Sequence, residues 1–421
     1  MTAPLHRPGD FLHALRERNL IQDYTRGDID SHLQEPRTIY IGFDPTADSL
    51  HVGSLATALQ LIRAARCGHR AIALVGGATA LIGDPSGKQS NRPLLTLDEV
   101  RANTSGIDAQ LRRLAANLCT DRPIAMVDNH EWLGELGLLD FLREIGRHFT
   151  VSRMLTQDSV RNRLESGCSF TEFSYSLLQG YDFLHLARTQ GCTVQMGGSD
   201  QWGNMIAGVE LARRKDRRQL HAATSPLITK SDGSKFGKTE SGNVWLDPAR
   251  TTPDEFYQFW RSCRDSDVAR LFAHFTLLDV EEIAALTRES GQALEHAKEV
   301  LAHTLTTMVH GLAAAQEAAK RSVASVGAGN ATLPCEAIDA ARLENGIGII
   351  DLILRAGFAT SRSAARRLIL GGAVRINGER IGEPDHRTTT ASLDADGSLL
   401  LQVGKKRARR FAPASEEAYH G

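Results

Sequence analysis

The fold is indicated by three successive segments near the start of the chain: Thr38-Ile-Tyr-Ile-Gly-Phe43, Asp44-Pro-Thr46 and Ser49-Leu-His-Val-Gly-Ser54. The first segment is rich in β-branched and aromatic residues, which predicts a buried strand. Apolar residues then recur at helical spacing as far as Gly68, which is well placed to end a helix. A helix that begins where a strand ends presents free N–H groups and a positive dipole end, which suits a phosphate.

Strands and helices alternate along the first half of the chain. We predict further strands at Arg70-Ala-Ile-Ala-Leu-Val75, Pro123-Ile-Ala-Met-Val127 and Cys192-Thr-Val-Gln-Met196, with helices between them. This alternation is typical of an α/β fold, in which parallel strands are joined by right-handed crossovers. Ligands of such folds bind at the carboxyl ends of the strands.

The pattern changes at Pro253, beyond which the chain is rich in Ala and Leu with helical periodicity. Gly327-Ala-Gly-Asn-Ala-Thr-Leu-Pro334 is a predicted linker, and a small α+β unit comes after it. We therefore expect five parts: a nucleotide-binding α/β domain (1–228), a glycine-rich loop with a connector (229–252), a helical domain (253–326), a linker (327–346) and the small α+β unit (347–421).

The composition is that of an ordinary globular protein. Of the 421 residues, 42% are hydrophobic and 24% are charged. The first thirty residues lack the apolar core of a signal peptide, and no stretch has the length and apolarity of a membrane span. The six cysteines include no CxxC pair, so neither a zinc ribbon nor a redox pair is indicated. Scattered cysteines without an export signal favour the cytoplasm.

Charge is distributed unevenly, although the net charge of the whole chain is only −1. Residues 347–421 contain 12 basic and 8 acidic side chains, and the preceding residues hold the acidic excess. A basic tail on an acidic body predicts that the tail meets a polyanion.

Two glycine-rich segments lie beside predicted strands. Gly83-Asp-Pro-Ser-Gly-Lys88 resembles a P-loop, but its first glycine is one position too close and Gln89 stands where Ser or Thr would hold magnesium. A P-loop kinase or GTPase is therefore disfavoured. Gly197-Gly-Ser-Asp-Gln-Trp-Gly-Asn204 directly follows a strand, and its glycines would allow a ligand to approach the backbone closely. Asp200 in this segment suits the hydroxyls of a ribose.

Two further patterns present polar side chains together. A helix predicted from Thr171 to about Ala187 carries Tyr175, Gln179 and Asp182 on one stripe, which would grip a small polar ligand or would form a solvated face. Lys230-Ser-Asp-Gly-Ser-Lys-Phe-Gly-Lys-Thr239 is a loop with paired lysines, suited to a polyphosphate or merely to solvent. Taken singly, each pattern fits either interpretation, as does His51.

Taken together, the motifs resemble one family. His51-Val-Gly-Ser54 resembles the HIGH motif and Lys235-Phe-Gly-Lys-Thr239 the KMSKS motif of class I aminoacyl-tRNA synthetases. Tyr40-Ile-Gly-Phe-Asp-Pro-Thr46, Tyr175-Ser-Leu-Leu-Gln-Gly-Tyr-Asp182 and Gly198-Ser-Asp-Gln-Trp-Gly-Asn204 are similar to bacterial tyrosyl-tRNA synthetases, in order along the chain. The tail from Ser363 to Gly378 resembles a small RNA-binding domain shared with a ribosomal protein.

The resemblance implies a Rossmann-like parallel-sheet catalytic domain, followed by an α-helical domain and a small α+β RNA-binding domain. It implies ATP-dependent formation of tyrosyl-adenylate and transfer of tyrosine to the 3' end of tRNA(Tyr). Mg²⁺ is expected to accompany ATP, and no protein-bound metal is expected. A homodimer is expected through the helices around residues 132–149, and no membrane partner is expected.

The resemblance also implies roles for individual residues. The implied tyrosine site consists of Tyr40, Asp44, Asp84, Tyr175, Gln179, Asp182 and Gln201. The implied ATP contacts are Gly42, Gly53, Gly198, Asp200 and Lys238. The implied catalytic contacts to the phosphates are Thr46, His51, Lys88, Arg92, Lys235, Lys238 and Thr239. The expected tRNA contacts are Arg213, Arg214, Arg366, Arg367, Lys405 and Lys406, although Arg213 and Arg214 also suit the cap of a helix C-terminus.

One residue departs from the family pattern, and three other functions compete. Ser54 replaces the last histidine of HIGH and has a shorter reach, so more of the expected phosphate contact falls to His51. A tryptophanyl-tRNA synthetase would share the fold, but Tyr40, Asp182 and the basic tail favour tyrosine. A small-molecule nucleotidyltransferase would have no need of that tail. A purely RNA-binding protein would have no need of the intact His51, Asp200 and lysine pair.

Overall fold

The computed structural model describes residues 7–86, 95–118, 123–161, 167–229, 236–239, 242–328, 335–394, 397–404 and 407–413. The chain forms two compact units, Met1–Ala319 and Lys320–Gly421. Each unit has a hydrophobic core of its own, and the apolar residues of one core do not belong to the other.

A five-stranded parallel sheet with the order β3-β2-β1-β4-β5 is the centre of the first unit. The strands are β1 (Thr38–Phe43), β2 (Arg70–Val75), β3 (Ala125–Asp128), β4 (Cys192–Gly198) and β5 (His221–Ser225). The predicted bounds of β1 and β2 are confirmed, and β4 is longer than predicted. The third strand begins at Ala125 rather than at Pro123, since proline has no N–H to donate to a ladder. The fifth strand was not predicted.

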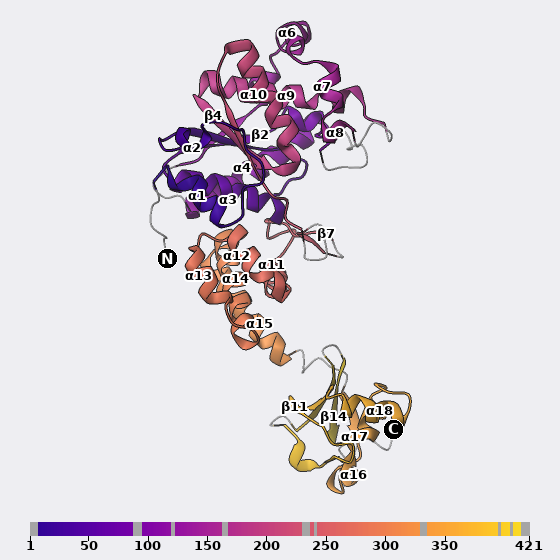
Figure 1. The fold of residues 1–421 in the computed structure, drawn as a ribbon. Helices are drawn as coiled ribbons and strands as arrows, with labels where there is room; N and C mark the ends of the chain where they lie inside the picture. Colours follow the sequence, from indigo (N-terminus) through magenta and orange to yellow (C-terminus); the bar gives the residue numbers. More distant parts are fainter. Residues whose placement is uncertain are drawn as a thin grey trace. The chain divides into compact units, whose positions relative to one another are not determined.

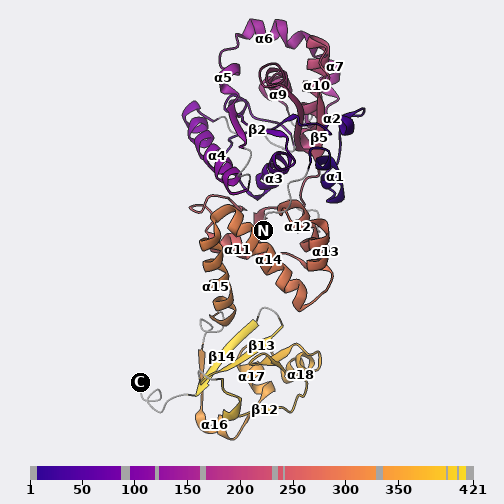
Figure 2. The ribbon, with the colours of Figure 1, turned by 90° about the vertical axis from the view of Figure 1, so that its left-hand side faces the viewer.

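Helices cover both faces of this sheet (Figure 1, Figure 2). Successive residues of β1 enter different cores: Ile39 and Ile41 pack with α3 (Val52–Arg66) and α4 (Leu97–Leu118), whereas Tyr40 packs with α9 (Phe170–Thr189) and α10 (Trp202–Asp216). This results from the alternation of side chains along a strand. Smaller elements of this part are α1 (Asp10–Glu17), α2 (Ile29–His32), η1 (Thr79–Leu81), α5 (His130–Leu133), α6 (Leu138–Glu144), η2 (Gly146–His148), α7 (Val151–Leu155), α8 (Asp158–Arg161), η3 (Ser199–Gln201), β6 (Lys238–Thr239) and β7 (Gly242–Asn243).

The helices after residue 252 share the core of the first sheet. They are α11 (Pro253–Arg261), η4 (Asp265–Asp267), α12 (Val268–Phe275), α13 (Val280–Thr287), α14 (Gln292–His310) and α15 (Leu312–Ala328). A capping box between Thr252 and Glu255 starts α11, with Pro253 at its first position. Trp260 and Phe272 are fully buried in the same cluster as residues of β1 and α3. The expected helical segment is therefore packed directly on the sheet domain.

The second unit has its own five-stranded sheet, in the order β11-β10-β13-β14-β8. Its elements are β8 (Cys335–Ile338), α16 (Ala340–Glu344), β9 (Ile347–Gly348), α17 (Ile349–Arg355), α18 (Arg362–Leu370), β10 (Val374–Ile376), β11 (Glu379–Arg380), β12 (Arg387–Thr388), η5 (Thr390–Ser392), β13 (Leu399–Val403) and β14 (Arg407–Pro413). Residues 327–346 were expected to be a linker, yet they include β8 and α16. Ile338 and Leu343 are buried in this core because β8 pairs with the distant β14.

One face of α4 holds the segment that leads from β1 to α3. Asn103 Nδ2 donates to the Pro45 carbonyl at 3.0 Å, and Gln110 Oε1 accepts from the Leu50 backbone at 2.8 Å. Gly106 lies between them on the same face, and a Cβ there would be 2.2 Å from the Asp48 carbonyl oxygen. The close approach of backbone to backbone therefore requires glycine in the middle of this helix.

Gly106→Ala is expected to destabilise the protein. Helix propensity alone favours alanine by about 1 kcal/mol, but the clash with the Asp48 carbonyl should outweigh this and lower the free energy of unfolding by about 1–3 kcal/mol. Urea denaturation measures the change. Ser105→Ala, at the neighbouring exposed position, is the control and should be neutral or slightly stabilising. A Gly106→Ala protein as stable as the wild type would refute the close approach.

Candidate active site

A cavity of about 590 Å³ lies at the carboxyl ends of the parallel strands. It gathers thirteen of the residues that the sequence analysis predicted: Tyr40, Gly42, Asp44, Thr46, His51, Gly53, Asp84, Tyr175, Gln179, Asp182, Gly198, Asp200 and Gln201. Lys88, Arg92 and Lys235 lie outside the described residues. Lys238 and Thr239 form strand β6. The stripe on α9 therefore faces a cavity, not solvent.

One end of the cavity carries a buried phenol and a buried carboxyl group. Within the part of the chain that the structure describes, Tyr40 Oη has no hydrogen-bond partner. Asp182 accepts from Asn129 Nδ2 at 2.9 Å and from Trp132 Nε1 at 2.8 Å. Burial raises the pKa of Asp182 to about 8, although these two donors act in the opposite direction. This end is suited to a ligand group that both donates and accepts a hydrogen bond, such as a phenol.

A hydrogen-bonded chain connects Asp182 to a second carboxylate, Asp44. Asn129 Nδ2 also donates to Thr79 Oγ1 at 3.0 Å, and Thr79 donates to Asp44 Oδ1 at 2.8 Å. Tyr175 Oη donates to Asp44 Oδ2 at 2.6 Å. Burial, reinforced by the Asp44 and Asp84 charges, raises the pKa of Tyr175, so this phenol remains a donor. The chain holds the two carboxyl groups in fixed positions.

A third carboxyl group, Asp84, is held by Gln201, by Asn204 in the first turn of α10 and by a backbone N–H of its own loop. Gln201 Nε2 donates to Asp84 Oδ2 at 2.7 Å, and Asn204 Nδ2 approaches Asp84 Oδ1 at 3.4 Å. The Ser86 backbone N–H donates to Oδ1 at 3.0 Å. Asp44 and Asp84 therefore add two carboxylates to the cavity beside the Asp182 carboxyl group, and this pair suits a ligand with an ammonium group.

The other end of the cavity is the N-terminus of α3. His51 caps this helix, and its Nδ1 accepts from the Ser54 backbone N–H at 3.3 Å. The imidazole is thereby fixed with Nε2 as the remaining ring nitrogen, which carries the proton. Thr46, Gly53 and Ser54 lie beside it in the cavity. The positive dipole end of this helix and the His51 ring N–H suit phosphate oxygens.

Some residues of the site were missed from the sequence. Gln195, in β4, is buried, lines the cavity and pairs in register with Tyr40, and its Oε1 has no partner among the described residues. A polar glutamine inside a strand that was predicted to be buried could have indicated that Gln195 belongs to the site. Asn129 directly follows β3, so the rule that ligands bind at carboxyl ends of strands indicates it as well. Trp132 carried no signal in the sequence.

Arg213 and Arg214 lie in the last turn of α10 and do not line this cavity. Arg213 Nη2 pairs with Glu210 at 3.0 Å. Arg214 Nη1 donates to the His148 carbonyl at 2.8 Å. These contacts fit the interpretation of the run as the basic end of a helix.

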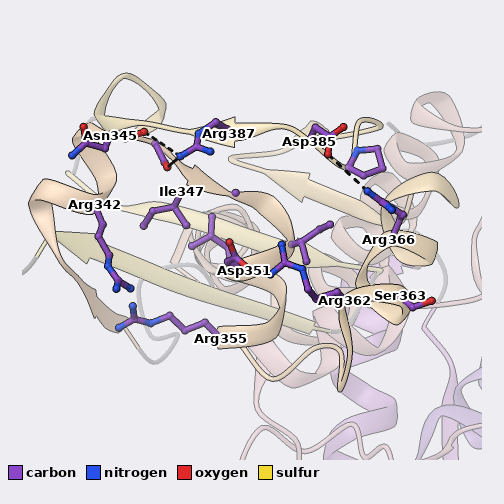
Figure 3. A pocket seen from close by; sticks show the side chains of 15 residues that line it. Arg342, Asn345, Ile347, Asp351, Arg355, Arg362, Ser363, Arg366, Asp385 and Arg387 are labelled. Atoms are coloured by element: carbon purple, nitrogen blue, oxygen red, sulfur yellow. Dashed lines mark hydrogen bonds and ion pairs between the residues drawn. The ribbon is translucent and has the colours of Figure 1, made fainter.

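The second unit contains a hollow of about 1040 Å³ with an arginine-rich lining (Figure 3). Arg342, Arg355, Arg362, Arg366 and Arg387 contribute to it, together with the acidic Asp351 and Asp385. Arg362 pairs with Asp351 at 2.6 Å and Arg366 with Asp385 at 3.9 Å, so the lining remains net positive. Arg367 belongs to α18 but not to this lining, and Lys405 and Lys406 lie outside the described residues.

No helix among the described residues combines the length and apolarity needed to span a bilayer. No group of three or more His, Cys, Asp or Glu side chains among them is arranged to hold a metal ion.

Comparison with known proteins identifies the family. A family model for class I tRNA synthetases (W and Y) matches residues 32–326, and an S4 domain model matches residues 349–389. The tyrosine–tRNA ligase of Anaeromyxobacter dehalogenans strain 2CP-1 is 44% identical over 94% of this chain and 98% of its own length. That of Roseiflexus castenholzii is 45% identical over 94% of this chain and 97% of its own.

A solved structure gives the same result. A C-terminally truncated mitochondrial tyrosyl-tRNA synthetase of Aspergillus nidulans matches with a TM-score of 0.67 at 30% identity, over 75% of this chain and 93% of that one. The predicted fold class and enzyme class are confirmed. The chain belongs to the tyrosine–tRNA ligases, a family of class I aminoacyl-tRNA synthetases.

Proposed function

We propose that this chain activates tyrosine with ATP in the cavity of the first unit and transfers the tyrosine to the 3' end of tRNA(Tyr). The observation that carries the proposal is that one cavity joins a phenol-type end, at Tyr40 and Asp182, to a phosphate-type end, at Thr46 and His51. Tyrosine and ATP would meet between these ends. A carboxylate oxygen of tyrosine attacks the α-phosphorus, and the bond to pyrophosphate breaks.

The phenol end would recognise the side chain of tyrosine. Asp182 accepts the substrate O–H, and the Tyr40 hydroxyl donates to the substrate oxygen. The lack of a partner for Tyr40 Oη among the described residues supports this role, because buried polar groups are rarely left unpaired. Asp44, Asp84, Tyr175, Gln179 and Gln201 would surround the ammonium and carboxylate groups.

The other end would hold ATP. Gly42, Gly53 and Gly198 allow the nucleotide to approach the backbone, and Asp200 accepts from ribose hydroxyls. Thr46 and His51 donate to the phosphates, while Lys88, Arg92, Lys235, Lys238 and Thr239 are the proposed partners of the pyrophosphate. Magnesium enters with ATP as part of the substrate. These groups act by alignment and by stabilising charge on the phosphates, with no covalent step on the protein.

The second unit and the basic run of α10 would serve the tRNA. Arg366 of the arginine-lined hollow would contact phosphates, as would Arg367, Lys405, Lys406, Arg213 and Arg214. Affinity through such contacts falls as salt rises. The match of residues 349–389 to an S4 domain and the net positive lining support this division.

A second copy of the chain would cover an apolar surface on α6 and α7. Leu138, Leu139 and Val151 are 71%, 79% and 61% exposed, and Leu142 and Leu155 lie near them in sequence. Exposed leucine and valine side chains favour an interface where they gather on one surface. A two-fold axis would bring the same surface of both copies together. Trp132, which donates to Asp182, lies just before this surface in the chain.

Tyr40→Phe should weaken the selection of tyrosine over phenylalanine. Loss of one hydrogen bond to the substrate phenol should lower kcat/KM for tyrosine by about five- to tenfold and leave that for phenylalanine nearly unchanged. Pyrophosphate exchange measures both. Tyr181→Phe, on α9 but outside the cavity lining, is the control. Unchanged discrimination in Tyr40→Phe would remove Tyr40 from the tyrosine site.

Truncation after Ala328 should separate the two half-reactions. The cut removes β8 together with its partner β14 and leaves the first unit whole. Tyrosine-dependent pyrophosphate exchange should stay within about twofold of the full chain, whereas kcat/KM for tRNA charging should fall about tenfold or more because several phosphate contacts are lost. Normal charging by the truncated protein would show that the second unit is dispensable.

Leu139→Asp should convert the dimer into a monomer. A charge in the centre of an apolar interface has to be desolvated without a partner. Sedimentation equilibrium at micromolar concentration measures the mass, with Leu312→Asp as the control at another exposed leucine. A wild-type monomer, or a Leu139→Asp dimer, would reject this surface as the interface.

A further inference from the structure

Helix α12 belongs to the helical segment, yet it forms part of the wall of the ATP end of the cavity. His274 from α12 lines the cavity. So do Ile228 and Thr229, which come after β5, and Phe236. No motif in the sequence indicated α12 as part of the site. The contacts that hold α12 in place therefore also determine the positions of residues that line the cavity.

Arg270 contacts this wall in two ways. Its Nη2 donates to the Thr229 carbonyl at 2.6 Å and to Asp267 Oδ1 at 2.8 Å. Its backbone carbonyl accepts from His274 Nδ1 at 2.9 Å, which fixes the proton of that imidazole on Nδ1. One residue thus holds two residues of the cavity lining, Thr229 and His274.

The other end of α12 is tied to the helix that carries the phosphate end. Arg63, on α3, is buried and donates to the carbonyls of Ala273 at 3.2 Å, His274 at 3.0 Å and Thr276 at 2.8 Å. These are carbonyls of the helix C-terminus, where a cation is favourable. Helix α12 is therefore fixed to α3 at its C-terminal end and to Thr229 one turn earlier.

Phe236 anchors the same wall on its other side. Its backbone N–H donates to the Ile228 carbonyl at 3.2 Å. Its ring lies 5.3, 5.7 and 5.8 Å, centroid to centroid, from Phe259, Trp260 and Phe275 of α11 and α12. These two helices lie next to each other at this end of the first unit (Figure 1). Both Thr229 and Phe236 are therefore attached to the helical segment.

We propose that Arg270 is a positioning residue for the ATP half of the reaction, which holds Thr229 at the distance from α3 that ATP requires. It does not touch the reacting atoms and acts through the Thr229 carbonyl. The inference rests on the proposed binding of ATP in this cavity. Alignment of reactants tolerates little displacement, so release of this wall should impair ATP use while the tyrosine end, on β1 and α9, keeps its geometry.

A purely structural role gives a different result. If the ion pair with Asp267, the N-cap residue of α12, were the whole function of Arg270, its loss would lower stability without affecting ATP and tyrosine differently. The decisive comparison is therefore between the Michaelis constants of the two substrates, made well below the Tm of each variant.

The experiment uses the full chain with Arg270→Met, which keeps most of the packing volume, and Arg270→Lys, which keeps one cationic donor. Arg261→Met is the control, because Arg261 on α11 pairs with Glu299 at 2.9 Å and does not line the cavity. Pyrophosphate exchange gives kcat and KM for each substrate, and equilibrium dialysis gives tyrosine affinity. Thermal unfolding shows whether each variant is folded.

We expect Arg270→Met to lower kcat/KM for ATP by about ten- to a hundredfold, with tyrosine affinity within about twofold of wild type. Arg270→Lys should recover part of the loss, and Arg261→Met should match wild type. Equal losses for both substrates, or ATP kinetics within twofold of wild type in Arg270→Met, would overturn the proposal. If Arg270→Met does not fold, the same criteria apply to Arg270→Lys, for which an intermediate ATP defect is expected. A wild-type chain without tyrosine-dependent exchange would instead refute the proposed function.

Discussion

Five parallel strands that end at one edge are the constraint on which the site depends. Because the side chains of β1 alternate, Ile39 and Ile41 enter one core while Tyr40 is turned toward the layer of α9 and α10. The same edge then receives Asp44 after β1 and Asn129 after β3. Helix α4 fixes the position of the segment before α3 through two hydrogen bonds, made by Asn103 and Gln110, and through the close approach of Gly106. The cavity is thus a consequence of the register and connections of the sheet.

The polar groups at the phenol end are buried, so they have lost their hydrogen bonds to water. Their arrangement indicates what binds there. Burial raises the pKa of Asp182 to about 8, even though Asn129 and Trp132 donate hydrogen bonds to it and act in the opposite direction. Tyr40 Oη, by contrast, lacks a partner among the described residues. A ligand phenol supplies one donor and one acceptor, which completes both groups. Burial of polar side chains without internal pairing is expected at functional sites, where the ligand is the missing partner.

Local sequence patterns were sufficient to predict much of the fold. Strands that are defined by pairing with distant parts of the chain could not be predicted from them. Strands β1 and β2 are short apolar runs rich in strand-forming residues, and the stripe on α9 has helical spacing, so the bounds of the strands and the face of the helix could be predicted from the sequence. Strand β5 reads His-Ala-Ala-Thr-Ser, which has little β propensity, and β8 is defined only by its pairing with β14 some seventy residues later. Arg270 was not found because its partner is a backbone carbonyl, which no sequence pattern marks. Thirteen predicted residues line one cavity, because several of their motifs follow strands whose carboxyl ends meet at the same edge of the sheet.

Whether the cavity of the first unit activates tyrosine can be measured by amino-acid-dependent exchange of labelled pyrophosphate into ATP, catalysed by the full chain. It reports formation of the aminoacyl-adenylate without any requirement for tRNA, so it depends only on the cavity of the first unit. We expect strong exchange with tyrosine and none with tryptophan. Exchange with phenylalanine should be far weaker, because phenylalanine would leave Tyr40 and Asp182 without a hydrogen-bond partner. Exchange with tryptophan but not with tyrosine, or no exchange with any amino acid, would contradict this expectation.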